Sequence, residues 1–440
     1  MIGNSSFPYQ IGGGPTWAGR GVTGEAQAGV AAWLGNLYFQ AAPLAFSTQN
    51  ASFTLAPNGL SGAEAAADAR FPLDIDAPQR FGSSSYQRFD PGASILSFDI
   101  AHLTAALTSA SQRWGPARDY PLVLGPNAGG FPTLYAGTST PVDLWLFKIH
   151  GRVEYGRLSQ SALAAPVDGR RWRIGSGVVG TILPRGVPGL EIGGTRFIHR
   201  PWEGSIVSLQ TLSRPFGPGL NLTGVAHNEL FENQVASVFA RWALPAAKVE
   251  FYTELYREDF PGHFHEAPSL IEKPDDLMSY TFGFQHVLMV RDRRVQVVRA
   301  EVVNGETSHQ EREGRGFLTP DPSYIHTIVT QGHTLNGLIL GSPEAYGGAG
   351  WRIGFDDYIP DGRHSISLER TLRLDWLPTE VLGARIRPDE VYALRAELIR
   401  FYKGADYGIT LIPALNLNRN LVALHDVWNI AVAVSARGLP

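Results

Sequence analysis

The sequence predicts an all-β fold, a closed antiparallel β-barrel that crosses a membrane with its strands. Apolar and polar residues alternate in many segments of about ten residues, as in strands with one face on lipid and one on water. Aromatic side chains stand near the segment ends, and short connections alternate with long ones. No apolar run reaches about eighteen residues, so the sequence contains no candidate for a helical membrane span.

The composition narrows the class of protein. A soluble chain of 440 residues usually forms two or more domains, whereas a large barrel uses this length in one, so residues 1–440 are predicted to be a single barrel domain. The formal net charge of −4 argues against a nucleic-acid partner, which requires a basic face. The absence of cysteine excludes disulfides, thiolate metal sites and cysteine nucleophiles, and it is usual in chains that cross an oxidising periplasm.

The alternation is clear in residues 248–256. Phe251 and Leu255 fall on one face of a strand, and Glu250 and Glu254 fall on the other. Alternation alone also fits a soluble β-sandwich, but repeated full charges on the polar face favour a water-filled lumen. The set expected to face lipid comprises Val249, Phe251, Leu255, Leu394, Leu398, Ile430 and Val432. The set expected to face the lumen comprises Glu250, Glu254, Arg395 and Glu397.

The lengths of the connections predict the orientation of the barrel. Tight turns are expected at 244–246, 291–294, 360–363 and 404–406, and longer polar stretches at 200–234, 257–278, 305–323, 377–388 and 416–425. The long loops of such barrels lie outside the cell, and this parity places the C-terminus in the periplasm. About seventeen strands can be assigned, but a bacterial barrel of one chain needs an even number, so one strand is missing, most simply before residue 110.

Residues 57–92 form the first segment that does not alternate. The alanine-rich run 61–70 predicts a short helix, with Ser61 at the capping position. We interpret residues 57–92 as a short helical insertion in the barrel.

Residues 111–141 form the second such segment and are too rich in proline and glycine for a membrane strand. They form either a surface loop or a segment folded into the lumen. We favour the lumen, with Arg113, Arg118 and Asp119 paired to charges of the wall, because plugs are common in barrels of this width. The residues assigned to this plug are Arg113, Trp114 and Asn127.

Several short motifs follow one another in order along nearly the whole chain. They are Trp17–Gly21 with Gly29, Arg113–Pro116, Pro121-Leu122, Asn127-Ala128, Phe131-Pro132, Leu190–Gly193, Tyr252–Asp259, and Tyr324–Gly341 with His326 and Gly332. In this order they resemble the Wzi family of outer-membrane capsule-assembly proteins. The resemblance implies a barrel of about eighteen strands in the bacterial outer membrane, within the range of such barrels. It also implies a small helical element on the periplasmic side and binding of capsular polysaccharide at the cell surface.

The sequence departs from that family in three places. Met1–Asn4 is not a basic start followed by an apolar stretch, so we expect a processed form or a truncated or misassigned start. The end, Arg437–Pro440, lacks the terminal aromatic residue that barrel-assembly machinery favours, and the helix-like run 61–70 is short. Outer-membrane lipid and the barrel-assembly machinery are still the expected partners of a barrel.

No pattern of catalytic or metal-binding residues stands out. His263 and His265 alternate near Asp259, but no third ligand follows at a fixed spacing, so a solvated loop is the better interpretation. Glu250 and Glu254 match a pair of glycosidase carboxylates in type, yet the polar face of a strand explains them more simply. Nucleophile elbows, phosphate loops and dinucleotide fingerprints do not occur. The sequence therefore predicts no enzyme, no metal and no cofactor.

The predicted long loops carry residues that suit sugar binding. Aromatic faces stack on pyranose rings, while arginine and carboxylate groups bind hydroxyls or an anionic polysaccharide. The candidates are Arg200, Trp202, Glu203, Phe260, His263, His265, Arg312 and Arg315. We therefore predict a protein that binds capsular or extracellular polysaccharide and anchors or assembles it at the cell surface. The alternative is a porin-type diffusion channel for sugars or small solutes, which an open lumen would favour.

Overall fold

The computed structural model describes residues 1–10, 13–164, 172–202, 212–216, 232–258, 278–306, 322–373 and 387–438. Its regular structure is almost all strand, in one antiparallel sheet of 22 strands and a separate two-stranded hairpin. The helical pieces include the 3-10 helices η1 (Gly62–Ala66), η3 (Arg214–Phe216), η5 (Pro245–Ala247), η7 (Pro343–Ala345) and η8 (Arg419–Leu421). Among the described residues, no helix is both long and apolar enough to span a membrane. The predicted all-β antiparallel class is confirmed.

The first third of the wall is made of short strands. They are β2 (Gly21–Gln27), β3 (Val30–Leu34), β4 (Leu37–Ala41), β5 (Leu44–Thr48), β6 (Tyr86–Asp90), β7 (Ile95–Ile100), β8 (Leu103–Thr108), β9 (Thr133–Thr138) and β10 (Val142–Leu144). Pro43, Pro91 and Pro141 lie in three of the breaks between consecutive strands. Proline has no backbone N–H for the ladder, so it interrupts a strand without ending the wall.

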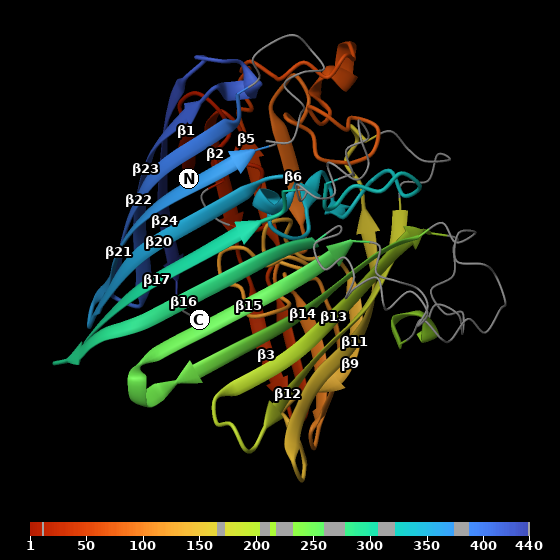
Figure 1. Ribbon diagram of the computed structural model, residues 1–440, viewed down its shortest axis with the longest axis vertical. Helices are drawn as coiled ribbons and strands as arrows, with labels where there is room; N and C mark the ends of the chain where they lie inside the picture. The colour runs from red at the N-terminus through yellow and green to blue at the C-terminus, as the bar shows by residue number, and fades with distance from the viewer. Residues whose placement is uncertain are drawn as a thin grey trace.

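The rest of the wall is made of long strands. They are β11 (Phe147–Ser159), β12 (Trp172–Pro184), β13 (Leu190–Pro201), β14 (Asn233–Leu244), β15 (Val249–Glu258), β16 (Met278–Arg291), β17 (Arg294–Asn304), β20 (Ala349–Ile359), β21 (Gly362–Arg373), β22 (Asp389–Tyr402), β23 (Ala405–Leu417) and β24 (Val427–Gly438). Each pairs antiparallel with the next, and Figure 1 shows them tilted side by side around the molecule. The hairpin of β18 (Thr334–Leu335) and β19 (Leu338–Ile339) stands apart from this wall.

The two ends of the wall meet at its shortest strand. In β1 (Ile2–Asn4), Ile2 is opposite Thr23 of β2 on one side and Ala433 of β24 on the other. The alternation search misses β1 because three residues are too few to show a period. It lies before residue 110, where a missing strand was expected.

Connections divide the barrel into two ends. At the first, here called the turn end, the chain turns at 35–36, 101–102, 145–146, 185–189, 245–248, 292–293, 360–361 and 403–404. At the other, the loop end, the described parts of the connections are 49–85, 109–132, 160–164, 212–216, 305–306, 322–348, 387–388 and 418–426. β24 finishes at the turn end, as the predicted parity requires.

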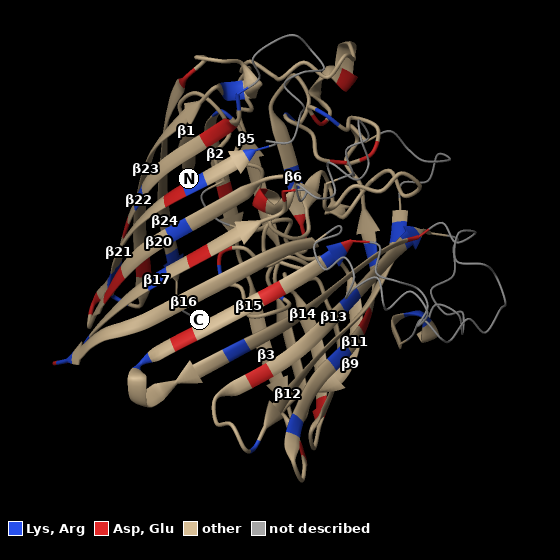
Figure 2. Ribbon diagram, in the orientation of Figure 1, with Lys and Arg blue, Asp and Glu red and all other residues tan. Residues whose placement is uncertain are grey.

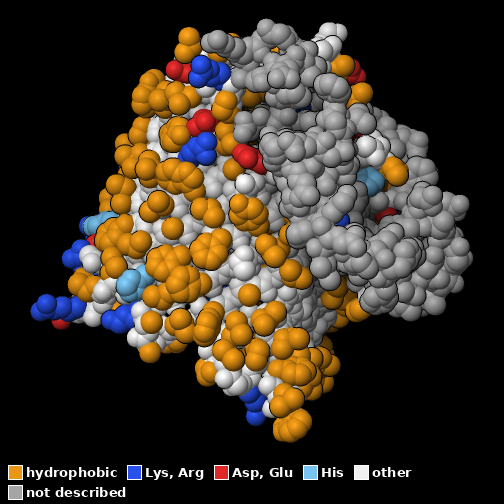
Figure 3. Space-filling model, viewed as in Figure 1, with side chains coloured by type: hydrophobic (Ala, Val, Ile, Leu, Met, Phe, Trp, Pro, Cys, Tyr) orange, Lys and Arg blue, Asp and Glu red, His pale blue; other side chains and the backbone are white. Residues whose placement is uncertain are grey.

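The two faces of the wall differ in exposure. In β15, Phe251 and Leu255 are 39% and 40% exposed, whereas Glu250 and Glu254 are 6% and 0% exposed. Leu394, Leu398 and Ile430 are also exposed, and Val249, Val432, Arg395 and Glu397 are half-buried. Figure 3 shows hydrophobic side chains across most of the described wall on one side of the molecule. An apolar outer surface of this extent suits contact with lipid.

Two segment predictions need correction. The run 61–70 is not a capped helix: only the 3-10 helix Gly62–Ala66 forms, and the Ser61 side chain makes no capping hydrogen bond. The proline- and glycine-rich segment ends at residue 132, not 141, because Thr133–Thr138 is the wall strand β9. Its run Thr-Leu-Tyr-Ala-Gly-Thr alternates and contains no proline.

Candidate functional site

Residues 111–132, here called the lumen segment, lie inside the barrel. Trp114, Tyr120, Leu122, Leu124 and Phe131 are all buried, although no strand or helix forms between residues 111 and 132. These side chains belong to the main hydrophobic cluster of the protein. The core therefore sits in the lumen, between the wall and this segment, and not between two layers of secondary structure.

One side of the lumen segment is bound to the wall by carboxylates. Glu301 of β17 accepts hydrogen bonds from the backbone N–H groups of Arg118, Asp119 and Tyr120, at 3.0, 3.1 and 2.6 Å. The Tyr252 hydroxyl of β15 donates to the same carboxylate. Charge-assisted hydrogen bonds to backbone amides are stronger than neutral ones, so Glu301 fixes the position of this turn of chain.

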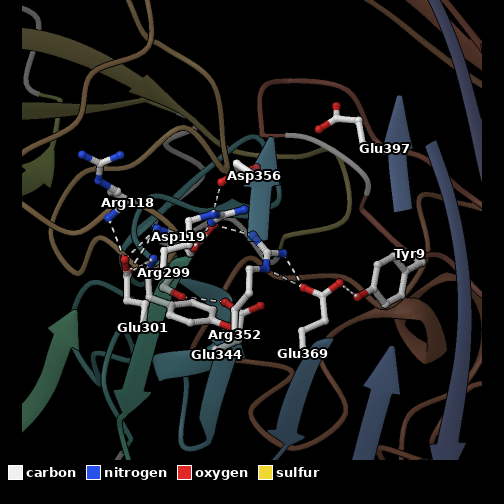
Figure 4. A network of polar contacts seen from close by, with 12 residues as sticks. Tyr9, Arg118, Asp119, Arg299, Glu301, Glu344, Arg352, Asp356, Glu369 and Glu397 are labelled. Carbon is white, nitrogen blue, oxygen red and sulfur yellow. Dashed lines mark hydrogen bonds and ion pairs between the residues drawn. The ribbon is translucent and has the colours of Figure 1, made fainter. Parts of the chain in front are cut away.

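Asp119 extends this contact into a network that crosses three strands. Its carboxylate pairs with Arg299 of β17 at 2.8 Å and with Arg352 of β20. Arg352 also pairs with Glu369 of β21, whose carboxylate accepts a hydrogen bond of 2.8 Å from the Tyr9 hydroxyl. Figure 4 shows Arg299 and Arg352 directed at Asp119, with Glu369 and Tyr9 beyond Arg352. The network ties the N-terminal segment, the lumen segment and the wall together.

The other side of the lumen segment packs on residues 322–346, here called the inner loop. The Tyr324 hydroxyl donates to the Leu122 carbonyl at 2.8 Å, and His333 Nε2 lies 2.6 Å from the Val123 carbonyl. Gly125 N–H donates to the Leu340 carbonyl at 2.8 Å. This side consists of neutral hydrogen bonds and buried apolar side chains.

A cavity of about 1050 Å³, here called the vestibule, opens beside the lumen segment. Its lining residues Asp99, Glu191, Glu250, Tyr358 and Arg363 all lie close to turns of the wall, so the vestibule occupies the turn end. Figure 2 shows acidic and basic positions next to each other on β13, β14 and β15. The lining is charged and polar, as a water-filled space requires.

Six arginines line the vestibule, and five of them pair with carboxylates. The pairs are Arg118–Glu250 at 3.4 Å, Arg152–Glu154 at 3.9 Å, Arg241–Glu191 at 2.9 Å, Arg299–Asp356 at 2.9 Å, and Arg363–Glu397. The sixth, Arg113 of the lumen segment, makes no ion pair or hydrogen bond with any described residue. Its charge is therefore the least compensated among these arginines.

The predicted lumen residues fall into the site in different ways. Glu250 pairs with Arg118, and Glu254 accepts a hydrogen bond of 3.3 Å from the Leu122 N–H, so both touch the lumen segment. Asn127 donates to the Ile339 carbonyl at 2.7 Å, and Trp114 is buried. Glu397 pairs with Arg363, whereas Arg395 is half-buried on β22.

The predicted sugar-binding residues are not brought together in the described part of the chain. Arg200 lies near the end of β13, and Trp202 directly follows that strand, its N–H donating to the Trp172 carbonyl at 2.9 Å. The other candidates lie outside the described residues: Glu203, Phe260, His263, His265, Arg312 and Arg315.

The sequence analysis missed the inner-loop partners of the lumen segment. Tyr324 and His333 lie about two hundred residues from it, and no local pattern links them. Arg352 could have been found, because Trp351 and Ile353 flank it with the alternation of a wall strand.

Comparison with known proteins yields solved structures only. No protein-family model matches the chain, and no curated protein matches it. Pseudomonas aeruginosa OccK7 (OpdD) is 9% identical with a TM-score of 0.43, and the match covers 95% of this chain and 92% of that one. OccK5 (OpdH) of the same organism is 10% identical with a TM-score of 0.43, and the match covers 100% of this chain and 95% of that one. The outer membrane protein OprD of Pseudomonas aeruginosa is 9% identical with a TM-score of 0.40, and the match covers 95% of this chain and 87% of that one.

These neighbours correct two predictions. The neighbours named here are OprD and Occ proteins and not Wzi-family proteins, so the predicted resemblance to the Wzi family is wrong. The predicted binding of capsular polysaccharide, which depended on that resemblance, is wrong with it. The predicted location holds: the protein lies in the bacterial outer membrane, and its apolar outer face suits that environment.

Proposed function

We propose that the protein is a diffusion channel for small polar solutes, a transport protein and not an enzyme. The wall supports a closed barrel, because β1 pairs with both β24 and β2. Four pairs of consecutive strands, β2–β3, β4–β5, β6–β7 and β9–β10, each continue one line of the wall. Counted once each, they reduce the 22 strands to eighteen, and barrels of about this number leave an aqueous lumen.

The observation that carries the proposal is the vestibule. A charged cavity of about 1050 Å³ has no place in a barrel whose interior is fully packed, but it suits a water-filled entrance. The lumen segment narrows the path beside it and presents Arg113 and Arg118 to this space. The channel is therefore narrow and selective. Beside the lumen segment the unpaired charge of Arg113 favours anionic over cationic solutes, while Asp99, near the turn 101–102, opposes it.

Planar-bilayer recording of the purified full chain tests this function. We expect discrete conductance steps and, in a salt gradient, a reversal potential on the anion side. Liposomes containing the protein should swell in small sugars or amino acids and not in large oligosaccharides. The proposal fails if protein that migrates as a folded, heat-modifiable barrel neither conducts ions nor admits any small solute.

A further inference from the structure

A second cavity, of about 220 Å³, lies at the loop end, away from the vestibule. Three separate parts of the chain form it: the N-terminal segment, the stretch after β5, and the connection from β23 to β24. Its lining residues are Ser6, Arg20, Phe53, Thr54, Arg419, His425 and Val427. Two hydrogen bonds hold these parts together, from Asn420 Nδ2 to the Thr54 carbonyl at 3.3 Å and from Arg20 Nη1 to the Ser52 carbonyl.

Arg419 is the central group of this cavity. It is only 8% exposed, and its guanidinium carbon lies 4.3 Å from the ring centre of Phe7 and 5.8 Å from that of Phe53. Within the described ranges, its side chain makes no ion pair and no hydrogen bond. The two aromatic rings make cation–π contacts with the guanidinium, and these contacts use no N–H group. The N–H groups of Arg419 are therefore left for a partner in the cavity.

The charges around Arg419 compensate it only in part. Burial lowers the pKa of Arg419 to about 10, the charge of Arg373 adds to this effect, and Asp389 opposes it. Asp389 is engaged elsewhere, accepting a hydrogen bond of 2.9 Å from the Asn420 N–H. Asp426 likewise accepts the Asn418 N–H at 2.9 Å, so both acids hold the turn in shape.

The other polar groups that line the cavity include several donors. Arg20 adds a second guanidinium, whose Nε and Nη1 also bind the Ser5 and Ser52 carbonyls, and Ser6 and Thr54 add hydroxyls. A buried cation without a counter-ion is costly, and an anion in the cavity would remove that cost. Two arginines with two hydroxyls offer more donors than the two oxygens of a carboxylate can use. A phosphate group, with three or four oxygens, matches this set better.

We propose that Arg419, Arg20 and the hydroxyls of Ser6 and Thr54 form a binding site for a phosphate group at the loop end of the barrel. This site is independent of the proposed channel, since it lies outside the vestibule and shares no residue with it. The phosphate can come from a free solute or from the headgroup of an outer-membrane lipid.

Calorimetric titration of the full chain in a neutral detergent tests the site. Inorganic phosphate should bind saturably, and Arg419→Gln should weaken binding at least about tenfold, the loss expected for a bidentate charged contact. Arg437→Gln is the matched control, because Arg437 is exposed near the end of β24 at the opposite end of the barrel, and it should bind like wild type.

A second arm distinguishes the source of the phosphate. Phosphatidylcholine nanodiscs containing lipid A, or lipid A without its phosphates, are compared for wild type and Arg419→Gln. Preference for the phosphorylated lipid, lost in Arg419→Gln, supports the site with a lipid headgroup as its ligand. Binding of inorganic phosphate without that preference supports it with a free solute. If wild type and a folded Arg419→Gln behave alike in both arms, the proposal is overturned.

Discussion

The two sides of the lumen segment are held by different chemistry. Toward the wall, Glu301 accepts three backbone N–H groups, and Asp119 pairs with two arginines. Toward the inner loop, the contacts are neutral hydrogen bonds and buried apolar side chains around Tyr324 and His333. Charged hydrogen bonds are directional and set position, whereas apolar burial contributes most of the free energy with little directional preference. The wall side therefore fixes where the segment lies, and the inner-loop side keeps it there.

The largest effect on the docking of the lumen segment is expected at Glu301, on the wall side. We expect Glu301→Leu to cost about 3–5 kcal/mol of the free energy that holds the segment in the lumen, because one buried and two partly buried N–H groups lose a charged acceptor. Trypsin should then cleave after Arg113 and Arg118 in folded barrels, and single-channel conductance should rise. Glu191→Leu serves as control, since among the described residues Glu191 pairs with Arg241 of the wall alone. If Glu301→Leu leaves both cleavage and conductance at wild-type levels, the carboxylate does not anchor the segment.

Acid should weaken the contacts between the lumen segment and the inner loop. Burial lowers the pKa of His333 to about 4, with the Val123 carbonyl opposing the shift and the charge of Arg173 adding to it. Because the docked state prefers the neutral ring, its stability is complete above the ordinary pKa of about 6.5 and falls as the pH drops toward 4. The loss at pH 4 should approach about 3 kcal/mol, at 1.36 kcal/mol for each pKa unit.

Trypsin needs near-neutral pH, so single-channel conductance, recorded at steps between pH 6.5 and 4, is the measurement. His333→Gln should flatten the pH dependence, whereas His102→Gln, at an exposed turn-end residue, should leave it unchanged. His199, whose ring centre lies 5.7 Å from that of His333, is the other titratable ring in this cluster. If the pH dependence remains in His333→Gln and disappears in His199→Gln, the titrating group is His199 of the wall and not His333 of the inner loop.

The wall could be predicted from sequence, and the contents of the lumen could not. Alternation is a local property, so a few neighbouring residues are enough to predict that Glu250 and Phe251 lie on opposite faces of the strand. The partners of the lumen segment depend on contacts between residues about two hundred positions apart, such as Leu122 and Tyr324. Proline and glycine predicted that residues 111–141 form no membrane strand, which is correct for 111–132 and wrong for Thr133–Thr138. They could not show which loop covers the segment.

The wrong family assignment has the same physical origin. Trp114 and Asn127, two residues quoted for the resemblance, are here a buried packing residue and a donor to the Ile339 carbonyl. Residues that hold a segment inside a barrel describe packing and carry no information about a ligand. The uncompensated charge of Arg113, which does bear on the solute, becomes visible only when the partners of the other five vestibule arginines are known.

A smaller effect sharpens the comparison on the inner-loop side. Tyr324→Phe removes the hydrogen bond to the Leu122 carbonyl while the buried ring is kept, so we expect a loss of about 1 kcal/mol. Cleavage by trypsin should therefore begin at a slightly lower urea concentration than in wild type. Without urea, the single-channel conductance should be the same as in wild type. A loss as large as that of Glu301→Leu would contradict the division of roles between the two sides.

The smallest effect on stability, and the most direct test of selectivity, is expected at Arg113. It pairs with no described residue, so Arg113→Gln should leave the docking of the segment unchanged while removing one positive charge from the vestibule. One charge acting on an ion about 7 Å away through water contributes about 0.6 kcal/mol, which favours an anion and disfavours a cation. The anion-to-cation permeability ratio should therefore fall by a factor of about seven when this charge is removed. The reversal potential in a potassium chloride gradient measures this ratio, and Arg113→Lys should retain the wild-type value because it keeps the charge. Equal reversal potentials for wild type and Arg113→Gln would mean that the paired arginines of the wall, and not the free one, set the selectivity of the channel.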